Sequence, residues 1–368
     1  MKKIFLITTL ILISNPIFSQ CNGRYETAIF NSVTKTTVNY SDVYSDNAHE
    51  MDIYTPDGDT EINRPLILFI HGGSFYGGDK SSVDCQDFCK EFAKKGYVTA
   101  SVNYRLVSLI NIASFLANHD EQYEEVLKAT ADVKAAIRYF RKDFATNNTY
   151  KIDPNTIFVG GYSAGAITAI HLAYIDDVSD LPTNPLDIQA VANSLGGIEG
   201  DAGNFGYSSS VSGVINFAGG INTLNWLDAD DEPLVSCQGD ADQTVSYNCG
   251  PGLGNPSVLT ICGTGELHPQ ADLVGVINDK LVFSGEGHSW GASGNNNPKF
   301  VQALNFTSEF LFPLLPCNNS TTSISEDTDK KTLLKIVDVM GRETNLKINT
   351  PLFYVFSDGS VERRTIIR

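Results

Sequence analysis

A serine between two glycines is the residue in this sequence whose setting most clearly suggests chemistry. Gly161-Tyr162-Ser163-Ala164-Gly165 follows the apolar run 156–160 and precedes an alanine-rich segment. Between a strand and a helix, such glycines allow a sharp turn that holds the serine hydroxyl exposed in a strained backbone conformation. The amides at the start of the following helix would stabilise a developing oxyanion. We therefore predict that Ser163 is a nucleophile.

A serine hydroxyl is a weak nucleophile, so it needs a base and an acid that orients the base. After a nucleophile on a strand–turn–helix, the acid and then the histidine follow in the chain, each behind a later strand. Three histidines follow Ser163. We predict His288 as the base because it follows the apolar run 281–284. His268 is the weaker candidate because it precedes an expected helix with no strand before it, and His171 is expected to pack inside the nucleophile's own helix.

The acid is expected after the apolar run 233–237, which leads into Gln238-Gly239-Asp240-Ala241-Asp242. Asp242 has the better placement, and Asp240 is its competitor. Either carboxylate could instead cap the next helix or turn. The intervals from Ser163 to Asp242 and from Asp242 to His288 suit two further strand–helix units.

Small residues follow another buried run at 65–70, in His71-Gly72-Gly73-Ser74-Phe75. We expect an oxyanion hole there, because small residues let backbone amides approach a substrate oxygen. Its donors are expected from Gly72, Gly73, Ser74 and Ala164. A phosphate-binding loop is the rival interpretation, but the Gly-Lys-Ser/Thr ending of such loops is missing. His71 is expected to brace the loop.

Four aromatic residues flank these motifs: Phe75, Tyr76, Tyr162 and Trp290. They are predicted to form a substrate pocket, although aromatic residues at these places could equally belong to the core. No Cys-x-x-Cys pair exists, which makes a zinc site a weak interpretation. We expect neither a metal ion nor an organic cofactor.

Apolar runs that alternate with helical patterns surround these motifs. Strands are expected at 65–70, 97–103, 156–160, 213–217, 233–237 and 281–284, and helices at 84–95, 123–142, 164–174 and 298–310. This alternation predicts an α/β domain with a mostly parallel central sheet and helices on both faces. The stretches 106–120 and 176–210 break the alternation, and we expect both to roof a site.

Composition excludes several other classes of protein. The 368 residues include 26 basic and 43 acidic side chains, a formal charge of −17, and 42% of them are hydrophobic. The acidic balance argues against nucleic-acid binding, and the apolar content against wholesale disorder. Scattered glycines and prolines exclude a coiled coil. Seven cysteines fit an exported protein, with one bridge expected among Cys237, Cys249 and Cys262 and core positions for Cys85 and Cys89.

The ends of the chain differ from its body. Residues 1–20 combine two lysines, a ten-residue apolar run and a polar exit, which predicts a signal peptide rather than a transmembrane helix. Residues 21–317 are the expected catalytic domain, and 318–331 form a polar linker. Residues 332–368 contain short β-like runs separated by turn residues.

Together, the elbow, the oxyanion loop and the Ser–Asp–His order resemble the α/β-hydrolase superfamily, and within it the carboxylesterase branch with a His-Gly-Gly loop. Asn103-Tyr104-Arg105-Leu106 and Asp153-Pro154-Asn155 match that branch too. The resemblance runs from about residue 51 to 312. It implies a serine carboxylic-ester hydrolase with Ser163 as nucleophile, Asp242 as acid and His288 as base. The chain departs from the branch at Gln238, where a histidine is usual, and at Ser74, where a third glycine is common.

The last segment resembles the C-terminal sorting domains of type IX secretion cargo. Asp338-Val339-Met340-Gly341-Arg342-Glu343 and Asp358-Gly359-Ser360-Val361-Glu362 carry this resemblance. It implies export by the type IX secretion machinery to the cell surface or medium, so that the substrates would be short acyl, acetyl or aromatic esters of extracellular polymers. A lipase, a polyester hydrolase or a serine peptidase of the same fold remain the alternatives.

Overall fold

The computed structural model describes residues 21, 23–317, 333–337, 342, 344, 351–356 and 361–365. The expected signal peptide and linker lie outside the described residues. The chain divides into two compact units, Met1–Asn319 and Ser320–Arg368. Within the described part of the chain, no helix is both long and apolar enough to cross a bilayer.

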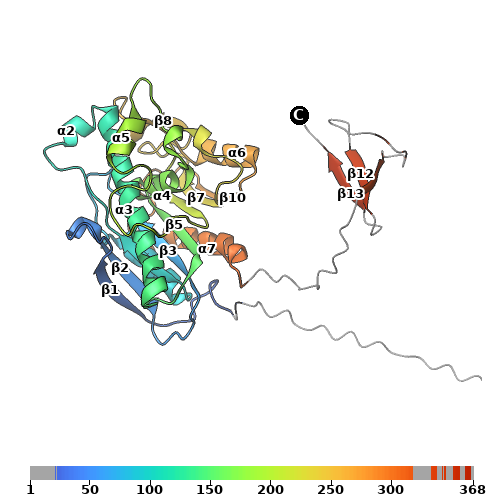
Figure 1. Ribbon diagram of the computed structural model, residues 1–368, viewed down its shortest axis with the longest axis horizontal. Coiled ribbons are helices and arrows are strands. Elements are labelled where there is room, and N and C mark those ends of the chain that lie inside the picture. The colour runs from blue at the N-terminus through green and yellow to red at the C-terminus, as the bar shows by residue number, and fades with distance from the viewer. Residues whose placement is uncertain are drawn as a thin grey trace, which may run out of the picture. The chain divides into compact units, whose positions relative to one another are not determined.

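An eight-stranded sheet forms the centre of the larger unit (Figure 1). Its strands run in the order β1-β2-β4-β3-β5-β6-β7-β10, and every neighbouring pair from β4 to β10 is parallel. They are β1 (Val33–Asn39), β2 (Glu50–Pro56), β3 (Arg64–Ile70), β4 (Val98–Val102), β5 (Ile152–Tyr162), β6 (Val214–Phe217), β7 (Leu234–Gly239) and β10 (Asn278–Phe283). The expected α/β fold with a mostly parallel sheet is confirmed.

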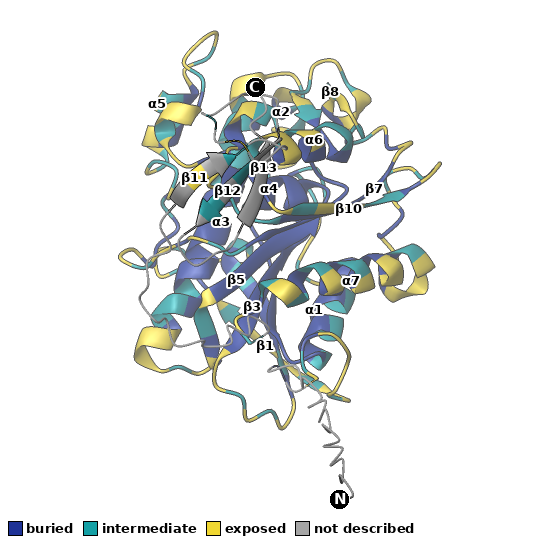
Figure 2. Cartoon of the chain, turned by 90° about the vertical axis from the view of Figure 1, so that its right-hand side faces the viewer, coloured by how far each residue is buried: buried dark blue, intermediate teal, exposed yellow. Residues whose placement is uncertain are grey.

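Helices cover both faces of this sheet because its central strands are apolar on both sides. In β3, Leu66 and Leu68 pack with one apolar cluster, whereas Ile67 and Phe69 pack with the other. The first cluster includes residues of α3 (His119–Thr146), α4 (Ala164–Tyr174) and α6 (Thr264–Val274). The second includes residues of α1 (Val83–Lys94) and α7 (Pro298–Leu311). Strands β3, β4, β6 and β7 are accordingly buried along their length, while the outward faces of the helices are exposed (Figure 2).

The antiparallel edge formed by β1 and β2 is absent from the predicted elements. β1 reads VTKTTVN and is mostly exposed, so its sequence carries little apolar signal. It pairs with β2 in antiparallel register, and β2 pairs with β4 in the same way. Pairing with a neighbour, rather than burial, therefore defines this strand.

The two predicted insertions do different things. The 106–120 stretch contains α2 (Ile112–Phe115) and leads into α3. The 176–210 stretch contains α5 (Ile188–Ser194) and packs beside α3, where Glu199 contacts Lys134 and Arg138 at 3.2 and 2.8 Å. The expectation that 176–210 also roofs the site is wrong, because none of its residues lines the cavity beside Ser163.

A third insertion lies between β7 and α6. We call residues 244–262 the hairpin segment, because it contains β8 (Cys249–Pro251) and β9 (Thr260–Cys262) in antiparallel pairing. A disulfide joins Cys249 to Cys262 across this pair, which agrees with the bridge expected in this region. Cys237, like Cys85 and Cys89, is a free buried thiol.

The smaller unit contains a three-stranded antiparallel sheet. Its strands are β11 (Leu333–Val337), β12 (Pro351–Phe356) and β13 (Val361–Thr365), with β12 in the centre. The first two coincide with the short β-like runs of the sequence.

A second disulfide joins Cys21 to Cys317, across a sequence separation of 296 residues. It joins the first and the last described residue of the larger unit. Closing a longer loop removes more entropy from the unfolded chain, by about 3 kcal/mol for fifteen residues and about 4.7 kcal/mol for a hundred.

We predict that replacing both Cys21 and Cys317 by serine lowers the free energy of unfolding more than the same double replacement of Cys249 and Cys262, whose separation is 13 residues. The loop-length difference corresponds to about 3 kcal/mol. Urea denaturation of the three proteins under oxidising conditions measures it. An equal or larger loss from the short loop would contradict loop closure as the source of the stability.

Candidate active site

The serine predicted as nucleophile sits between β5 and α4 in a conformation that few residues adopt. Ser163 has φ 56° and ψ −119°, an arrangement that costs free energy for a residue with a Cβ and persists only where packing enforces it. Its amide donates a hydrogen bond to the Phe217 carbonyl at the end of β6. The strand–turn–helix context predicted from the sequence is present.

The glycines around Ser163 allow helix α4 to approach the ends of the neighbouring strands closely. A Cβ on Gly165 would collide with the carbonyl group of Ile70, the last residue of β3, and a Cβ on Gly161 would collide with Gly165. The first turn of α4 therefore touches the ends of β3 and β5 directly. This contact holds Ser163 above the sheet edge.

Three distant side chains meet at this edge. His288 Nε2 lies 2.8 Å from Ser163 Oγ, and His288 Nδ1 lies 2.7 Å from Asp242 Oδ2. Ser163 follows β5, Asp242 follows β7 and His288 follows β10. These strands are parallel, so their carboxyl ends lie on the same side of the sheet, where ligands of open α/β sheets bind.

The Asp242 carboxylate is buried and held from two sides. Its Oδ1 accepts hydrogen bonds from the amides of Thr244 and Val245, at 2.8 and 3.0 Å. Its Oδ2 therefore remains available to the imidazole. The competitor Asp240 points elsewhere and accepts a hydrogen bond from the Gly285 amide, so it braces the loop after β10.

The loop that carries His288 is fastened by Tyr162, the residue before the serine. The Tyr162 hydroxyl donates to the His288 carbonyl and accepts from the Gly291 amide at 3.1 Å. Burial raises the pKa of this phenol, which keeps its proton available for donation. One side chain next to the serine thus fixes the backbone of the histidine.

Trp290 is buried in the same loop and packs against Phe217 and Phe283. Neither Tyr162 nor Trp290 lines the cavity described below. Both residues are predicted from the sequence to form a substrate pocket. In the structure they lie outside the cavity and hold the loop that carries His288. Tyr76 does not line the cavity either, but its ring packs edge-on against Phe115, which does.

The loop after β3 passes beside Ser163. A Cβ on Gly72 would lie 3.0 Å from the Tyr162 carbonyl oxygen and 3.2 Å from Ser163 Cβ. Ser74 and Phe75 have φ values of 55° and 66°, so the chain turns sharply there. Within the described part of the chain, the amides of Gly73 and Ser74 donate no hydrogen bond. They are free to donate to a substrate oxygen.

His71 braces this loop, as expected from the sequence. Its ring stacks on Tyr104 with centroids 4.5 Å apart, and its Nδ1 lies 2.7 Å from the Gly72 carbonyl oxygen. Burial lowers the pKa of His71 although the Gly72 carbonyl opposes the shift. The imidazole is therefore neutral and structural.

An apolar cavity of about 80 Å³ opens beside Ser163. Five parts of the chain line it: the loop after β3, the start of α3 with the preceding α2, helix α4, the loop after β6, and the hairpin segment. The lining residues are Ser74, Phe75, Phe115, Gln122, Tyr123, Val126, Ser163, Ala164, Ile167, His171, Asn222, Thr244, Val245, Gly252, Leu253, Val258, Leu259 and Ile261. Of the two insertions predicted to roof a site, only the 106–120 stretch contributes.

The hairpin segment and Asn222 belong to this site but are not among the residues predicted from the sequence. Two signals pointed to the hairpin segment: a pair of cysteines separated by 13 residues, and a glycine- and proline-rich turn between them. Asn222 stands alone in a loop after β6, and no sequence pattern marks it.

The other histidines lie apart from Ser163 Oγ. His171 lies inside α4, as expected, and burial lowers its pKa to about 4 although the Ile167 carbonyl opposes the shift. His268 lies within α6 rather than before a helix, and its Nδ1 contacts Asn278 Oδ1 at 2.6 Å. Burial lowers its pKa to about 4 as well, against the opposing hydrogen bond of Asn278. Among the described residues, no group of three or more His, Cys, Asp or Glu side chains could hold a metal ion.

We predict that Gly165→Ala destabilises the protein by about 1–3 kcal/mol, the usual cost of overpacking. In an ordinary helix the same change stabilises by about 1 kcal/mol, so the sign tests the contact with Ile70. Gly77→Ala is the matched control, because its Cβ would meet no atom closer than 3.7 Å. Chemical denaturation measures both variants. A stabilised Gly165→Ala protein would disprove the close approach.

Comparisons with known proteins agree with this architecture. The BD-FAE family matches residues 51–254, a range that contains Ser163 and Asp242 and ends before His288. Gut esterase 1 of Caenorhabditis elegans is 30% identical over 110 residues, which cover 29% of this chain and 18% of that protein. Para-nitrobenzyl esterase of Bacillus subtilis (strain 168) is 29% identical over 120 residues, covering 32% and 22%. The matched part spans about a fifth of these relatives' length.

Two solved structures show the same fold. A thermophilic esterase of Thermogutta terrifontis, Est2, superposes with a TM-score of 0.53 at 21% identity, covering 75% of this chain and 91% of that one. A truncated carbohydrate esterase from gut microbiota gives 0.54 at 21% identity, covering 77% and 97%. The central sheet and its helices are those of the α/β-hydrolase fold. Because the family match spans more than half of the sequence, this chain belongs to the BD-FAE family.

Proposed function

We propose that this protein is a serine carboxylic-ester hydrolase that works through an acyl-enzyme. One observation carries the proposal: the continuous contact of Ser163 Oγ, the His288 imidazole and the buried Asp242 carboxylate, at 2.8 and 2.7 Å. This is the arrangement that turns a serine hydroxyl into a nucleophile. The similarity to named esterases supports the same reaction class.

The reaction begins with proton transfer from Ser163 to His288. The Asp242 carboxylate accepts a hydrogen bond from the Nδ1–H group of the ring, so the proton stays on Nδ1 and Nε2 is the basic nitrogen that faces Ser163 Oγ. As Oγ attacks the ester carbonyl, Nε2 takes its proton. The nearby carboxylate stabilises the imidazolium that forms.

Backbone amides receive the charge that develops on the carbonyl oxygen. We assign this role to the N–H groups of Gly73, Ser74 and Ala164, with Gly72 allowing the loop to approach. Ala164 begins helix α4, so its amide has no partner within the helix. Each such donor contributes about 2.7–4 kcal/mol to catalysis.

The tetrahedral intermediate collapses when His288 returns its proton to the leaving alcohol. The acyl group stays on Ser163 until His288 activates a water molecule in the same way and the free acid leaves. Every proton that is transferred moves between Ser163, His288, the leaving alcohol and water. These steps therefore need no metal ion or organic cofactor.

We further propose that the enzyme acts outside the cell on short acyl or aromatic esters of extracellular polymers. The signal-peptide pattern of residues 1–20 and the tail resembling type IX secretion cargo support export. Two disulfides fit the same destination, since disulfides persist in oxidising compartments.

A lipase is the second candidate, and one observation favours it. Leu109 and Ile110 are 83% and 90% exposed in the stretch that leads to α2. Exposed apolar side chains of this kind are suited to contact with a lipid surface. Activity on emulsified long-chain triglyceride that rises sharply above the solubility limit would favour this candidate.

We predict that Ser163→Ala lowers kcat on p-nitrophenyl butyrate by about 10⁴-fold or more, because the nucleophile is lost. Ser81→Ala, an exposed serine outside the site, is the control and should keep full activity. Stopped-flow mixing of the wild type should also give a burst of p-nitrophenol if deacylation is slow. Full activity of Ser163→Ala, or cleavage of an aminoacyl anilide without ester hydrolysis, would refute the proposal.

We predict that Asp242→Asn lowers kcat by about 10³- to 10⁴-fold with little change in fold, because the amide favours the wrong tautomer of His288. Asp240→Asn is the matched control, since its side-chain oxygen can still accept from Gly285. Steady-state kinetics of both variants decide between the two carboxylates. A large loss in Asp240→Asn with an active Asp242→Asn would reverse the assignment.

A further inference from the structure

We propose that the apolar cavity beside Ser163 is an acyl-binding pocket for an unbranched apolar acyl group of about six to eight carbons, and that the Tyr123–Asn222–His171 cluster sets its depth. This inference rests on the proposed ester hydrolysis and specifies the acid half of its substrate. It predicts weak activity on acetyl esters and a decline for long chains.

The position of the cavity relative to the reacting groups assigns it to the acyl side. Ser163, Ala164 and Ser74 line it, whereas His288 does not. In ester cleavage the leaving alcohol receives its proton from the histidine, so the alcohol lies on the histidine side. The acyl group is joined to the serine oxygen and has its carbonyl against the oxyanion amides. A cavity that contains the serine and those amides without the histidine therefore receives the acyl chain.

The walls of the cavity suit a hydrocarbon. Phe75, Phe115, Val126 and Ile167 line it from the body of the domain. From the hairpin segment, the apolar side chains are Val245, Leu253, Val258, Leu259 and Ile261. No Lys, Arg, Asp or Glu is present among the lining residues. Each buried methylene contributes a favourable free energy when it leaves water, so a longer acyl chain binds the transition state better until the cavity ends.

The depth of the cavity follows from helix α4. Ala164, Ile167 and His171 line it at successive turns of this helix. Seven residues at 1.5 Å each extend about 10 Å from Ala164 to His171. An extended hydrocarbon chain advances about 1.2 Å per carbon–carbon bond. This is about a third of the length of one extended amino-acid residue, which contains three backbone bonds. That depth holds about eight bonds, or six to eight acyl carbons once the contact distance at the end is allowed for.

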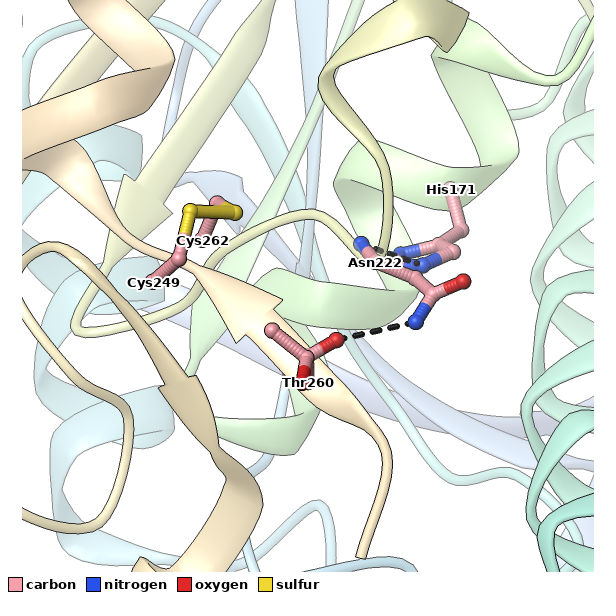
Figure 3. The surroundings of a disulfide bond; sticks show 5 residues. All are labelled: His171, Asn222, Cys249, Thr260 and Cys262. Carbon is pink, nitrogen blue, oxygen red and sulfur yellow. Dashed lines mark hydrogen bonds between the residues drawn. A yellow bond between two sulfur atoms is a disulfide. The ribbon is translucent and has the colours of Figure 1, made fainter.

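Polar side chains close the far end. The Tyr123 hydroxyl donates to Asn222 Oδ1 at 2.6 Å, and the backbone N–H of Asn222 donates to His171 Nε2 at 3.4 Å. Asn222 Nδ2 donates to the Thr260 carbonyl of β9 at 2.9 Å (Figure 3). Asn222, through its side chain and its backbone, thereby joins α3, α4 and the hairpin segment. A chain that reaches them must displace hydrogen-bonded groups, which costs more than burying a methylene gains.

The roof is held in place by two further connections. The Cys249–Cys262 disulfide lies close to Asn222 and Thr260 and ties the two strands of the hairpin segment (Figure 3). Gln122, which is buried, donates to the carbonyl oxygens of Phe115 and Ser257 and accepts from the Leu259 amide. The roof is therefore bonded to α2 and α3, and the depth of the pocket is fixed.

The first experiment measures kcat/KM of the wild-type protein on the p-nitrophenyl esters of acetate, butyrate, hexanoate, octanoate and dodecanoate. We expect a rise of about ten- to a hundredfold from acetate to a maximum at hexanoate or octanoate, followed by a decline at dodecanoate. Hexyl acetate carries the same chain on the alcohol and should gain little over ethyl acetate.

Two substitutions test the walls. Ile167→Phe fills the pocket one turn below Ser163 and should lower the hexanoate-to-acetate ratio of kcat/KM at least tenfold. Tyr123→Ala opens the far end and should raise the dodecanoate-to-hexanoate ratio. Val301→Phe, a partly exposed position on α7 outside the pocket, is the matched control and should leave the profile unchanged.

The outcomes separate this inference from the proposed function. Hydrolysis that depends on Ser163 but does not vary with acyl length, or that follows the alcohol chain instead, overturns the acyl pocket and leaves the esterase intact. A maximum at acetate, or ratios unaltered by both pocket variants, also overturns it. Absence of hydrolysis for every ester in the series overturns the esterase itself.

Discussion

The contact between Gly165 and the end of β3 is the constraint on which the site depends. It brings the first turn of α4 against Ile70, and the oxyanion loop begins at the next residue. The same approach therefore sets the position of Ser163 and its distance from the amides of Gly73 and Ser74. Any side chain at position 165 would therefore move Ser163 away from the amides of Gly73 and Ser74. The strained φ of Ser163 is a consequence of this packing.

The remaining two members of the site depend on the parallel arrangement of the sheet. Asp242 and His288 follow β7 and β10, which are adjacent strands. Their side chains meet because the loops after these strands start at the same edge. Tyr162 then links the serine turn to the histidine loop through the His288 carbonyl, so the end of β5 is connected directly to the loop after β10.

Much of this arrangement could be predicted from the sequence, since apolar runs and chain order carry it. The runs before Ser163 and Asp242 are buried strands, and burial on both faces gives a strong signal. In the strand before His288 only Phe283 is buried, so chain order carries that prediction. β1 gave no such signal because its residues are exposed and polar. The error over 176–210 has another cause: Glu199 and its partners on α3 are 61 and 65 residues apart, and no local pattern reveals such a pairing. The aromatic residues could not be assigned for the same reason, because the sequence does not say which side of a loop faces the core.

Chemistry and specificity are carried by different parts of the chain. The groups proposed to react sit at the ends of sheet strands, where packing against glycines and buried carbonyls leaves little freedom. The cavity proposed to hold the acyl group is instead lined by α4 and by two connections, 106–120 and 244–262, which Gln122 joins to each other. Loops tolerate change better than sheet ends. Variation in these two connections can therefore alter the acid that is accepted while the contact between Ser163 and His288 stays the same.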